Sequence, residues 1–142
     1  GDVRARIKRL KLDINPKKTE IRDFQRTGAV LSANRPLQYL GFTFDGQRIL
    51  LRSAALARYS QRMKQGVRLA KLTAKSRNTA RSSLGLKSND LYKRKLYEKY
   101  SHLGKQNFVR YGHRAADLLQ SQAIRDQLEP LWSRLVAEIT KP

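Results

Sequence analysis

The feature that most constrains this chain is a long stretch without acidic residues. No Asp or Glu occurs between Gln47 and Asn89, and only Asp90 and Glu98 are acidic from there to Ala116. A solvated helix ordinarily carries charges of both signs, so this stretch is predicted to face a polyanion. The 142 residues carry a net charge of +20, from 31 Lys and Arg against 11 Asp and Glu. Nucleic acid is therefore the expected partner.

Several classes of protein are excluded or disfavoured by composition. The absence of cysteine excludes a disulfide framework, a thiolate nucleophile and a Cys-ligated metal site. No apolar run approaches the ~18 residues of a membrane-spanning helix, and the first residues lack the apolar centre of a signal peptide. We therefore expect a cytoplasmic protein with no membrane partner. No glycine-rich phosphate-binding motif occurs, so the sequence indicates no nucleotide cradle.

The first part of the chain is predicted to hold one helix end and short extended pieces. Val3–Leu10 spaces its apolar residues three and four apart, which predicts the end of an amphipathic helix. An extended piece at 12–15 is expected to stop at Pro16, and a second strand is expected at 18–24. From there to Pro36 the sequence indicates a loop or an irregular hairpin.

The clearest local signal is a β-hairpin. Leu37–Phe44 and Arg48–Leu51 flank Asp45-Gly46, a dipeptide that favours tight hairpins because both of its residues tolerate positive φ. Ser53 is then expected to cap a long helix that ends near Asn78.

Two stripes run along that predicted helix. Its apolar stripe falls at steps of three and four, and a cationic stripe lies about a quarter turn away. Core contact and positive charge are thus presented side by side. The apolar stripe contains Leu56, Tyr59, Met63, Val67, Ala70 and Ala74, and the cationic stripe contains Lys64, Arg68, Lys71 and Lys75.

Three further helices are predicted. The first spans Asp90 to about His102, with one apolar face and one cationic face. The second runs from Phe108 to Leu118, and the third from Ile124 to Ile139, where Pro130 is expected to kink or restart it. On the first of these helices Tyr92, Leu96, Tyr100 and Leu103 are expected to point inward and Lys93, Arg94, Lys95 and Lys99 outward.

Strands followed by helices predict an α+β fold, a short β-hairpin tip joined to a helical bundle. Two short hairpins seldom form a stable sheet alone, so we expect the N-terminal part to belong to a larger unit.

Two motifs in this order resemble the end of the palm domain in bacterial reverse transcriptases of the group II intron, retron and phage-defence types. Leu12–Ile21 is similar to the Leu-x-Leu-Asn-x-x-Lys-Thr piece that follows a palm helix in that family, and Tyr39–Phe44 is similar to its aromatic-Leu-Gly-Phe hairpin. The segment Gly104–Tyr111, with Arg114–Ala116 and Ala123–Gln127, resembles C-terminal helical regions of the enzymes linked to phage defence. Together the similarities span most of the chain.

The resemblance implies three parts and one function. Residues 1–52 would be the end of the palm with a primer-grip-like hairpin, 53–103 a basic helical thumb and 104–142 the C-terminal helices. The whole would be part of an RNA-directed DNA polymerase, a nucleotidyltransferase that grips an RNA or DNA template–primer duplex, with antiphage defence as its setting. Its implied protein partner is the upstream fingers and palm portion.

The resemblance also implies roles for individual residues. Lys18 would lie near the phosphates of the incoming nucleotide and assist departure of pyrophosphate, an accessory catalytic role. The alternative is that Lys18 is an ordinary surface cation. The implied nucleic-acid contacts are the primer-grip residues Tyr39, Leu40, Gly41 and Phe42, and the thumb cations Arg58, Arg62, Lys64, Arg68, Lys71 and Lys75. For the hairpin, the alternative is a bulge at Gly41 with Leu40 and Phe42 buried.

The chain departs from the family at the catalytic carboxylates. Polymerisation needs paired aspartates that hold two metal ions, and this sequence has no Asp-Asp pair. We therefore expect no cofactor in this chain, and Mg²⁺ belongs to the complete enzyme. The metal-binding aspartates would reside upstream or on another chain.

The sequence fits two other interpretations. One is a self-contained basic RNA-binding protein without catalytic activity, and the other is a subunit that self-associates through 124–139. His102 and His113 have no carboxylate placed to complete a metal site or a triad, and are expected to be surface or cap residues. Trp132 lies beside an apolar stripe and is expected to pack in the core.

Overall fold

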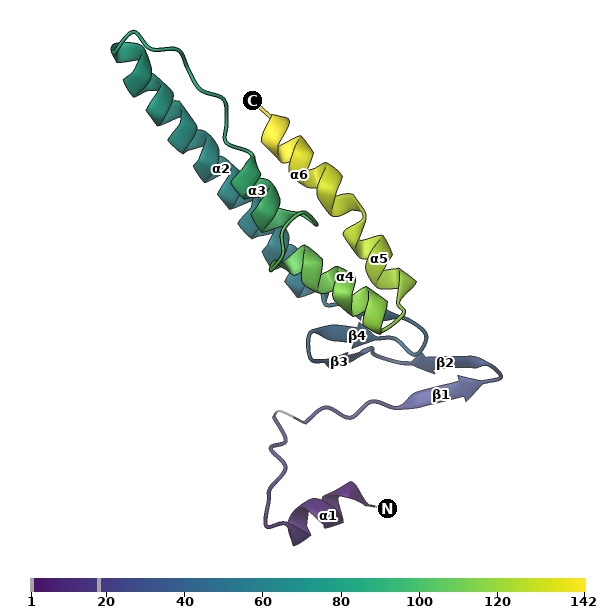
Figure 1. Cartoon of the computed structure of the whole chain (residues 1–142). Helices are drawn as coiled ribbons and strands as arrows, with labels where there is room; N and C mark the ends of the chain where they lie inside the picture. The colour runs from purple at the N-terminus through teal and green to yellow at the C-terminus, as the bar shows by residue number, and fades with distance from the viewer. Residues whose placement is uncertain (1, 18) are drawn as a thin grey trace.

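The computed structural model describes residues 2–17 and 19–142. It confirms the α+β fold, with two small antiparallel sheets followed by a helical bundle. Figure 1 shows helices α2 to α6 lying alongside one another, the strands at one end of them, and α1 held away by an extended segment. Lys18 lies outside the described residues.

Helix α1 spans Val3–Arg9, as predicted. The Asp2 carboxylate accepts a hydrogen bond from the Arg4 backbone N–H at 3.0 Å and caps the first turn. The described residues that follow, 10–17 and 19–23, form no helix or strand. A strand at 18–24 is therefore a wrong prediction for the described residues before Phe24, since β1 begins only there and the segment before it has no strand partner.

A regular two-stranded hairpin occupies the region before Pro36, where the sequence indicated either a loop or an irregular hairpin. Strand β1 spans Phe24–Thr27 and β2 spans Val30–Ala33, with Thr27 opposite Val30. Gly28 provides the turn with a φ of 62°, a conformation that glycine adopts without steric cost.

The second sheet has three strands in the order β3-β4-β5. They span Leu37–Tyr39, Phe42–Phe44 and Ile49–Leu51. The predicted hairpin at Asp45-Gly46 is present as the β4–β5 connection, where the Asp45 carboxylate accepts hydrogen bonds from two backbone N–H groups of its own loop. The predicted single strand at 37–44 is wrong, because the chain reverses at Leu40-Gly41.

Helix α2 spans Ser53–Ser83 and outlasts its predicted end at Asn78. Its apolar stripe is confirmed, with Tyr59, Met63, Val67 and Ala74 buried. The helix continues because nothing after Asn78 breaks it until Gly85, which takes a φ of 69°. Ser53 is not the cap: Arg52 occupies that position, and no side chain bonds the first turn.

Helix α3 spans Arg94–Tyr100 and begins later than predicted. The Asn78 amide accepts from the Asn89 N–H and donates to the Asn89 carbonyl, both at 2.9 Å, which holds the preceding segment extended along α2. Tyr92 and Leu103 therefore lie outside the helix and are exposed rather than inward.

The last three helices follow the predicted pattern. They are α4 (Phe108–Leu118), α5 (Gln122–Leu128) and α6 (Pro130–Thr140). Pro130 restarts the chain as α6, where a missing N–H costs nothing in the first turn. Tyr111 and Leu118 of α4 are exposed.

One core joins these helices to the second sheet. The Gln127 side chain accepts from the Leu51 N–H at 2.8 Å and donates to the Leu51 carbonyl at 3.1 Å, which satisfies the open edge of β5. Ser121 donates to the Ile49 carbonyl at 2.6 Å. The buried apolar residues of the core are Leu51, Tyr59, Met63, Val67, Leu96, Tyr100, Val109, Ala115, Ala116, Ile124, Leu128, Leu131, Leu135 and Ile139.

Candidate nucleic-acid interface

The β3–β4 turn presents two of the four predicted primer-grip residues to solvent. Tyr39 is 69% exposed and Leu40 is 76% exposed. Leu40 and Gly41 both take positive φ, 47° and 92°, as a two-residue hairpin turn requires. Phe42 is half-buried against the core and stacks on the Tyr111 ring at a centroid distance of 6.2 Å. The turn therefore offers Tyr39 and Leu40 for contact, while Phe42 anchors it.

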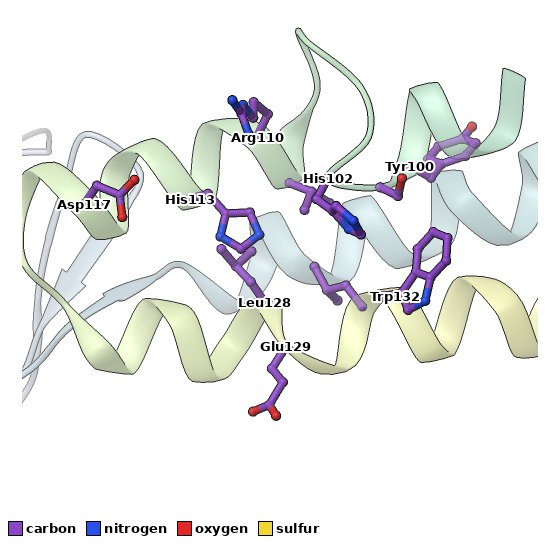
Figure 2. A pocket seen from close by; sticks show the side chains of 11 residues that line it. Tyr100, His102, Arg110, His113, Asp117, Leu128, Glu129 and Trp132 are labelled. Carbon is purple, nitrogen blue, oxygen red and sulfur yellow. The ribbon is translucent and has the colours of Figure 1, made fainter. Parts of the chain in front are cut away.

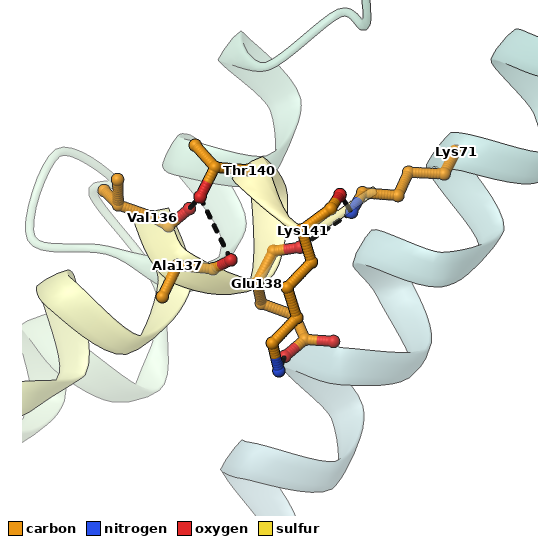
Figure 3. Close-up of polar contacts among 6 residues, drawn as sticks. All are labelled: Lys71, Val136, Ala137, Glu138, Thr140 and Lys141. Carbon is orange, nitrogen blue, oxygen red and sulfur yellow. Dashed lines mark hydrogen bonds and ion pairs between the residues drawn. The ribbon is translucent and has the colours of Figure 1, made fainter.

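The predicted cationic stripe of α2 lies on the edge of the helix that faces α6. We call Lys64, Arg68, Lys71 and Lys75 the α6-side row. Lys71 donates from its ammonium to the Glu138 carbonyl at 2.8 Å and to the Lys141 carbonyl at 2.5 Å (Figure 3). A cation at the C-terminal carbonyls of a helix stabilises that helix. Lys71 thus serves the fold, and this geometry does not support its use as a phosphate contact.

An acidic group also stands on the α6 side. The Lys141 ammonium bonds the Glu138 carboxylate at 3.0 Å. That hydrogen bond, with the charges of Lys141, Lys64 and Lys71, holds the pKa of Glu138 below its ordinary value. The carboxylate offsets part of the positive charge on this edge and would repel a phosphate brought close to it.

The opposite edge of α2 faces α3 and is basic without acidic groups. Arg58 and Arg62 line a hollow of about 490 Å³ together with Lys99 of α3. The wall beneath them is aromatic, since Phe108 stacks on the buried Tyr59 ring at 5.2 Å. Arg58 and Arg62 are exposed, and neither forms an ion pair within the described residues.

A second hollow of about 570 Å³ continues this surface along α2. Lys99 and Tyr100 border both hollows. We call the two together the α2–α3 groove. No described lining residue of either hollow is acidic. The second hollow adds the cations Arg77 and Lys95, the exposed Tyr92 and Leu69, and the hydroxyl of Thr73.

Gly66 allows the two helices of the groove to approach. A Cβ at this position would overlap the Tyr100 ring, whose Cε2 and Cζ atoms would lie at 2.8 Å. Tyr100 is buried and receives a hydrogen bond at its carbonyl from the Tyr59 hydroxyl at 2.6 Å. The Lys99 ammonium lies 5.5 Å from the Tyr100 ring centroid, a distance at which the ring attracts the cation and favours its position beside the groove.

An aromatic row connects the hairpin turn to the groove. Phe42 stacks on Tyr111, and Phe108 lies one helical turn away on the same face of α4. Phe108 in turn stacks on Tyr59 at the floor of the groove. Packed aromatic side chains therefore lie between the turn and the groove.

Of the groove cations, Arg58 and Arg62 were predicted from the sequence as nucleic-acid contacts, whereas Lys95, Lys99 and Arg77 were not. The sequence does contain a signal for Lys95 and Lys99. Leu96 and Tyr100 are spaced four residues apart, which places them on one face of a helix. Both are buried, and they fix which face of α3 turns toward α2. Arg77 joins them only because the segment before α3 returns along α2.

Within the described residues no cluster of three or more His, Asp or Glu is arranged to hold a metal ion. In the same part of the chain, none of the helices combines the length and the apolar character of a membrane span.

The chain matches no protein-family model and no curated protein.

Proposed function

We propose that this chain is the C-terminal palm and thumb portion of a bacterial RNA-directed DNA polymerase of the antiphage-defence type. It grips a template–primer duplex through phosphate contacts in the cytoplasm. Contacts of this kind position a duplex without reading its sequence. The catalytic aspartates and their Mg²⁺ ions belong to the upstream fingers and palm portion, which is the protein partner.

The observation that carries the proposal is the α2–α3 groove, an acid-free row of cations along one edge of a long helix. Arg58 and Arg62 lie one helical turn apart, which is a rise of ~6 Å. Phosphates follow one another at ~3.4 Å of axial rise along one strand of a duplex, so two cations separated in this way can each neutralise a different phosphate. Lys99 and Lys95 repeat this spacing on α3.

The hairpin turn supports the same proposal. An exposed Leu in the left-handed region costs about 1 kcal/mol or more of backbone strain, and Asn or Gly would form the turn more easily. Strain of this kind concentrates at functional positions. In the palm portion this turn contacts the primer strand. That contact explains why Leu40 stands at a position where it lowers the stability of the fold.

The groove is tested by neutralising three of its cations together. In the variant Arg58→Gln, Arg62→Gln, Lys99→Gln, we expect the affinity for an RNA–DNA duplex to fall by orders of magnitude at low salt. The slope of log affinity against log salt should become shallower by roughly 0.9 for each phosphate that the variant no longer neutralises. Fluorescence anisotropy with a labelled duplex across a salt titration measures both quantities.

Two control variants carry the same change in charge. One replaces Arg4, Arg6 and Lys8 of α1 with Gln, and the other replaces Lys64, Arg68 and Lys75 of the α6-side row. We expect little change from the first and a smaller loss than the groove variant from the second. Equal losses in all three would show that binding follows net charge alone, and the groove assignment would be wrong.

The polymerase assignment is tested by the coding sequence upstream of this chain. It should encode an aromatic-x-Asp-Asp turn, the metal-binding element that the family requires and this chain lacks. An unrelated domain at that position would leave duplex binding standing but would favour the self-contained RNA-binding protein.

A further inference from the structure

A third hollow lies on the other side of Tyr100 from the α2–α3 groove. It has a volume of about 440 Å³ and opens between α4 and the α5–α6 junction. In Figure 2, His113 of α4 and His102 of the loop after α3 point toward α6, and Trp132 of α6 points back toward His102. We call this hollow the His102–Trp132 pocket.

Trp132 is fixed in place yet open to solvent. Its indole ring lies 5.3 Å from the Tyr97 ring and 5.3 Å from the His102 ring, which meets it edge-on. The residue is nevertheless 38% exposed, whereas the sequence predicted it in the core. A large aromatic ring that is held by neighbours and still exposed is the arrangement on which unpaired bases stack.

His113 supplies hydrogen bonding at the opposite wall. The residue is half-buried, and this burial lowers the pKa of its imidazole below the ordinary value of 6.5. The ring is therefore neutral at pH 7, with one N–H donor and one acceptor nitrogen. The edge of a nucleobase carries the complementary groups. The floor between the two walls is apolar, formed by the buried Val109, Leu128 and Leu131.

The rim of the pocket is positively charged on one side and negatively charged on the other. Arg110 stands on the α4 side and Glu129 on the α5–α6 side, both turned outward in Figure 2. Asp117 is neutralised by Arg125, whose guanidinium lies 2.9 Å from its carboxylate. Arg110 is then the unpaired cation among these rim groups, so an anionic group fits on the α4 side and is repelled on the other.

We propose that the His102–Trp132 pocket binds a single unpaired nucleotide of a nucleic-acid strand, with the base stacked on Trp132 and its phosphate beside Arg110. The proposal rests on the nucleic-acid binding proposed above, and not on the polymerase assignment. The pocket and the α2–α3 groove share Tyr100 as a wall. The pocket and the groove are therefore neighbours across the buried Tyr100, and a strand that leaves the gripped duplex on this side would come close to Trp132.

Trp132 is the only tryptophan of the chain, so its fluorescence reports on this pocket alone. We expect a short single-stranded oligo(A) to quench it in a saturable way, and a blunt duplex to bind without quenching it. Adenosine 5′-monophosphate carries the same base and phosphate but no adjoining strand, and should quench only at much higher concentration. Equal affinity for the mononucleotide and the oligonucleotide would overturn the strand assignment.

Substitutions locate the site. With a labelled oligo(A) followed by anisotropy, Trp132→Ala should weaken binding about 5- to 150-fold, the equivalent of one base stack. Trp132→Phe keeps an aromatic ring and should retain most of the affinity. Retained affinity in this variant would show that the loss in Trp132→Ala comes from lost stacking and not from a folding defect. Arg110→Gln should weaken binding, while Arg134→Gln, the same charge change on the exposed part of α6, should not.

Two results would contradict the pocket while leaving the groove intact. The first is normal duplex binding with no quenching by any single strand. The second is equal quenching by blunt duplex and oligo(A), which would mean that Trp132 senses the phosphate backbone. Loss of duplex binding on neutralising the groove is measured separately and tests the proposed function by itself.

Discussion

The chain on either side of Leu51 is built in two different ways. Among the described residues none before Leu51 is buried, whereas the core described above begins at Leu51 and extends to Ile139. The N-terminal region, residues 2–17 and 19–50, is shaped by turns, a helix cap and two hairpins. The bundle region, residues 51–142, is shaped by side-chain packing. Local hydrogen bonds can set a conformation, but burial of apolar area supplies most of the stability.

The N-terminal region retains apolar side chains that nothing covers. Val3, Leu10, Leu12 and Ile21 are all more than half exposed, and a hollow of about 610 Å³ lies between α1 and the extended segment. Exposed apolar groups gathered in one region are typical of a surface that packs on another body. The palm partner of the proposed function would supply that body, and the comparison predicts that substitutions on the two sides of Leu51 have different consequences.

The largest expected effect is on the bundle region. Leu135 is fully buried in α6, and Leu135→Ala should lower the free energy of unfolding by about 2–5 kcal/mol, because it removes apolar packing and leaves a cavity. Urea unfolding of the whole chain measures the change.

The matched control is the same substitution in the N-terminal region. Leu12→Ala should change the free energy of unfolding by no more than ~0.5 kcal/mol, as for other exposed sites. A loss comparable to that of Leu135→Ala would mean that the segment around Leu12 packs on the bundle in solution, and the comparison would fail.

A smaller effect is expected at the hydrogen bond beneath the groove. Tyr59→Phe removes the donor to the buried Tyr100 carbonyl and should cost about 1–3 kcal/mol. Burial, with a smaller contribution from Tyr100, raises the pKa of Tyr59 from 10.0 to about 12.

The raised pKa gives this prediction a pH dependence. The unfolded chain loses the phenol proton near pH 10, while the folded chain keeps it until about pH 12. The stabilising contribution of Tyr59 is thus complete below pH 10 and is lost as the pH rises through 12. Unfolding measured at several alkaline pH values should show wild type approaching Tyr59→Phe; a constant difference would mean that the hydroxyl is not buried.

Periodicity predicted the bundle region well because its helices bury one face each. The stripe from Leu56 to Ala74 and the restart at Pro130 follow from spacing and from the chemistry of proline. The α2–α3 groove was only half predicted. The position of Lys99 follows from the four-residue spacing of the buried Leu96 and Tyr100, whereas Arg77 enters the groove through the hydrogen bonds between Asn78 and Asn89, an interaction between distant residues that no local pattern encodes.

The N-terminal region was harder to predict for a physical reason. Its strands pair through the backbone and bury little, so alternation of polar and apolar residues is weak there. The turn at Leu40-Gly41 was missed because Leu is an unusual residue for positive φ, and the sequence around it fits a continuous strand. Trp132 was expected in the core because neighbouring apolar residues do not show which of them remains open to solvent.

The smallest effect on stability, and the sharpest contrast with the bundle, is expected at Leu40. Leu40→Asn relieves the left-handed strain and should raise the free energy of unfolding by up to ~1 kcal/mol. The same change removes the exposed apolar side chain that, in the proposed function, contacts the primer strand. Affinity for a duplex with a recessed 3′ end should therefore fall about tenfold, the equivalent of ~1.4 kcal/mol of apolar burial. Affinity for a blunt duplex without that end should stay unchanged.

Thermal unfolding and anisotropy on the same preparation measure both effects. An equal loss on both duplexes would remove the primer strand from this turn, and a loss of stability would show that Leu40 serves the fold after all.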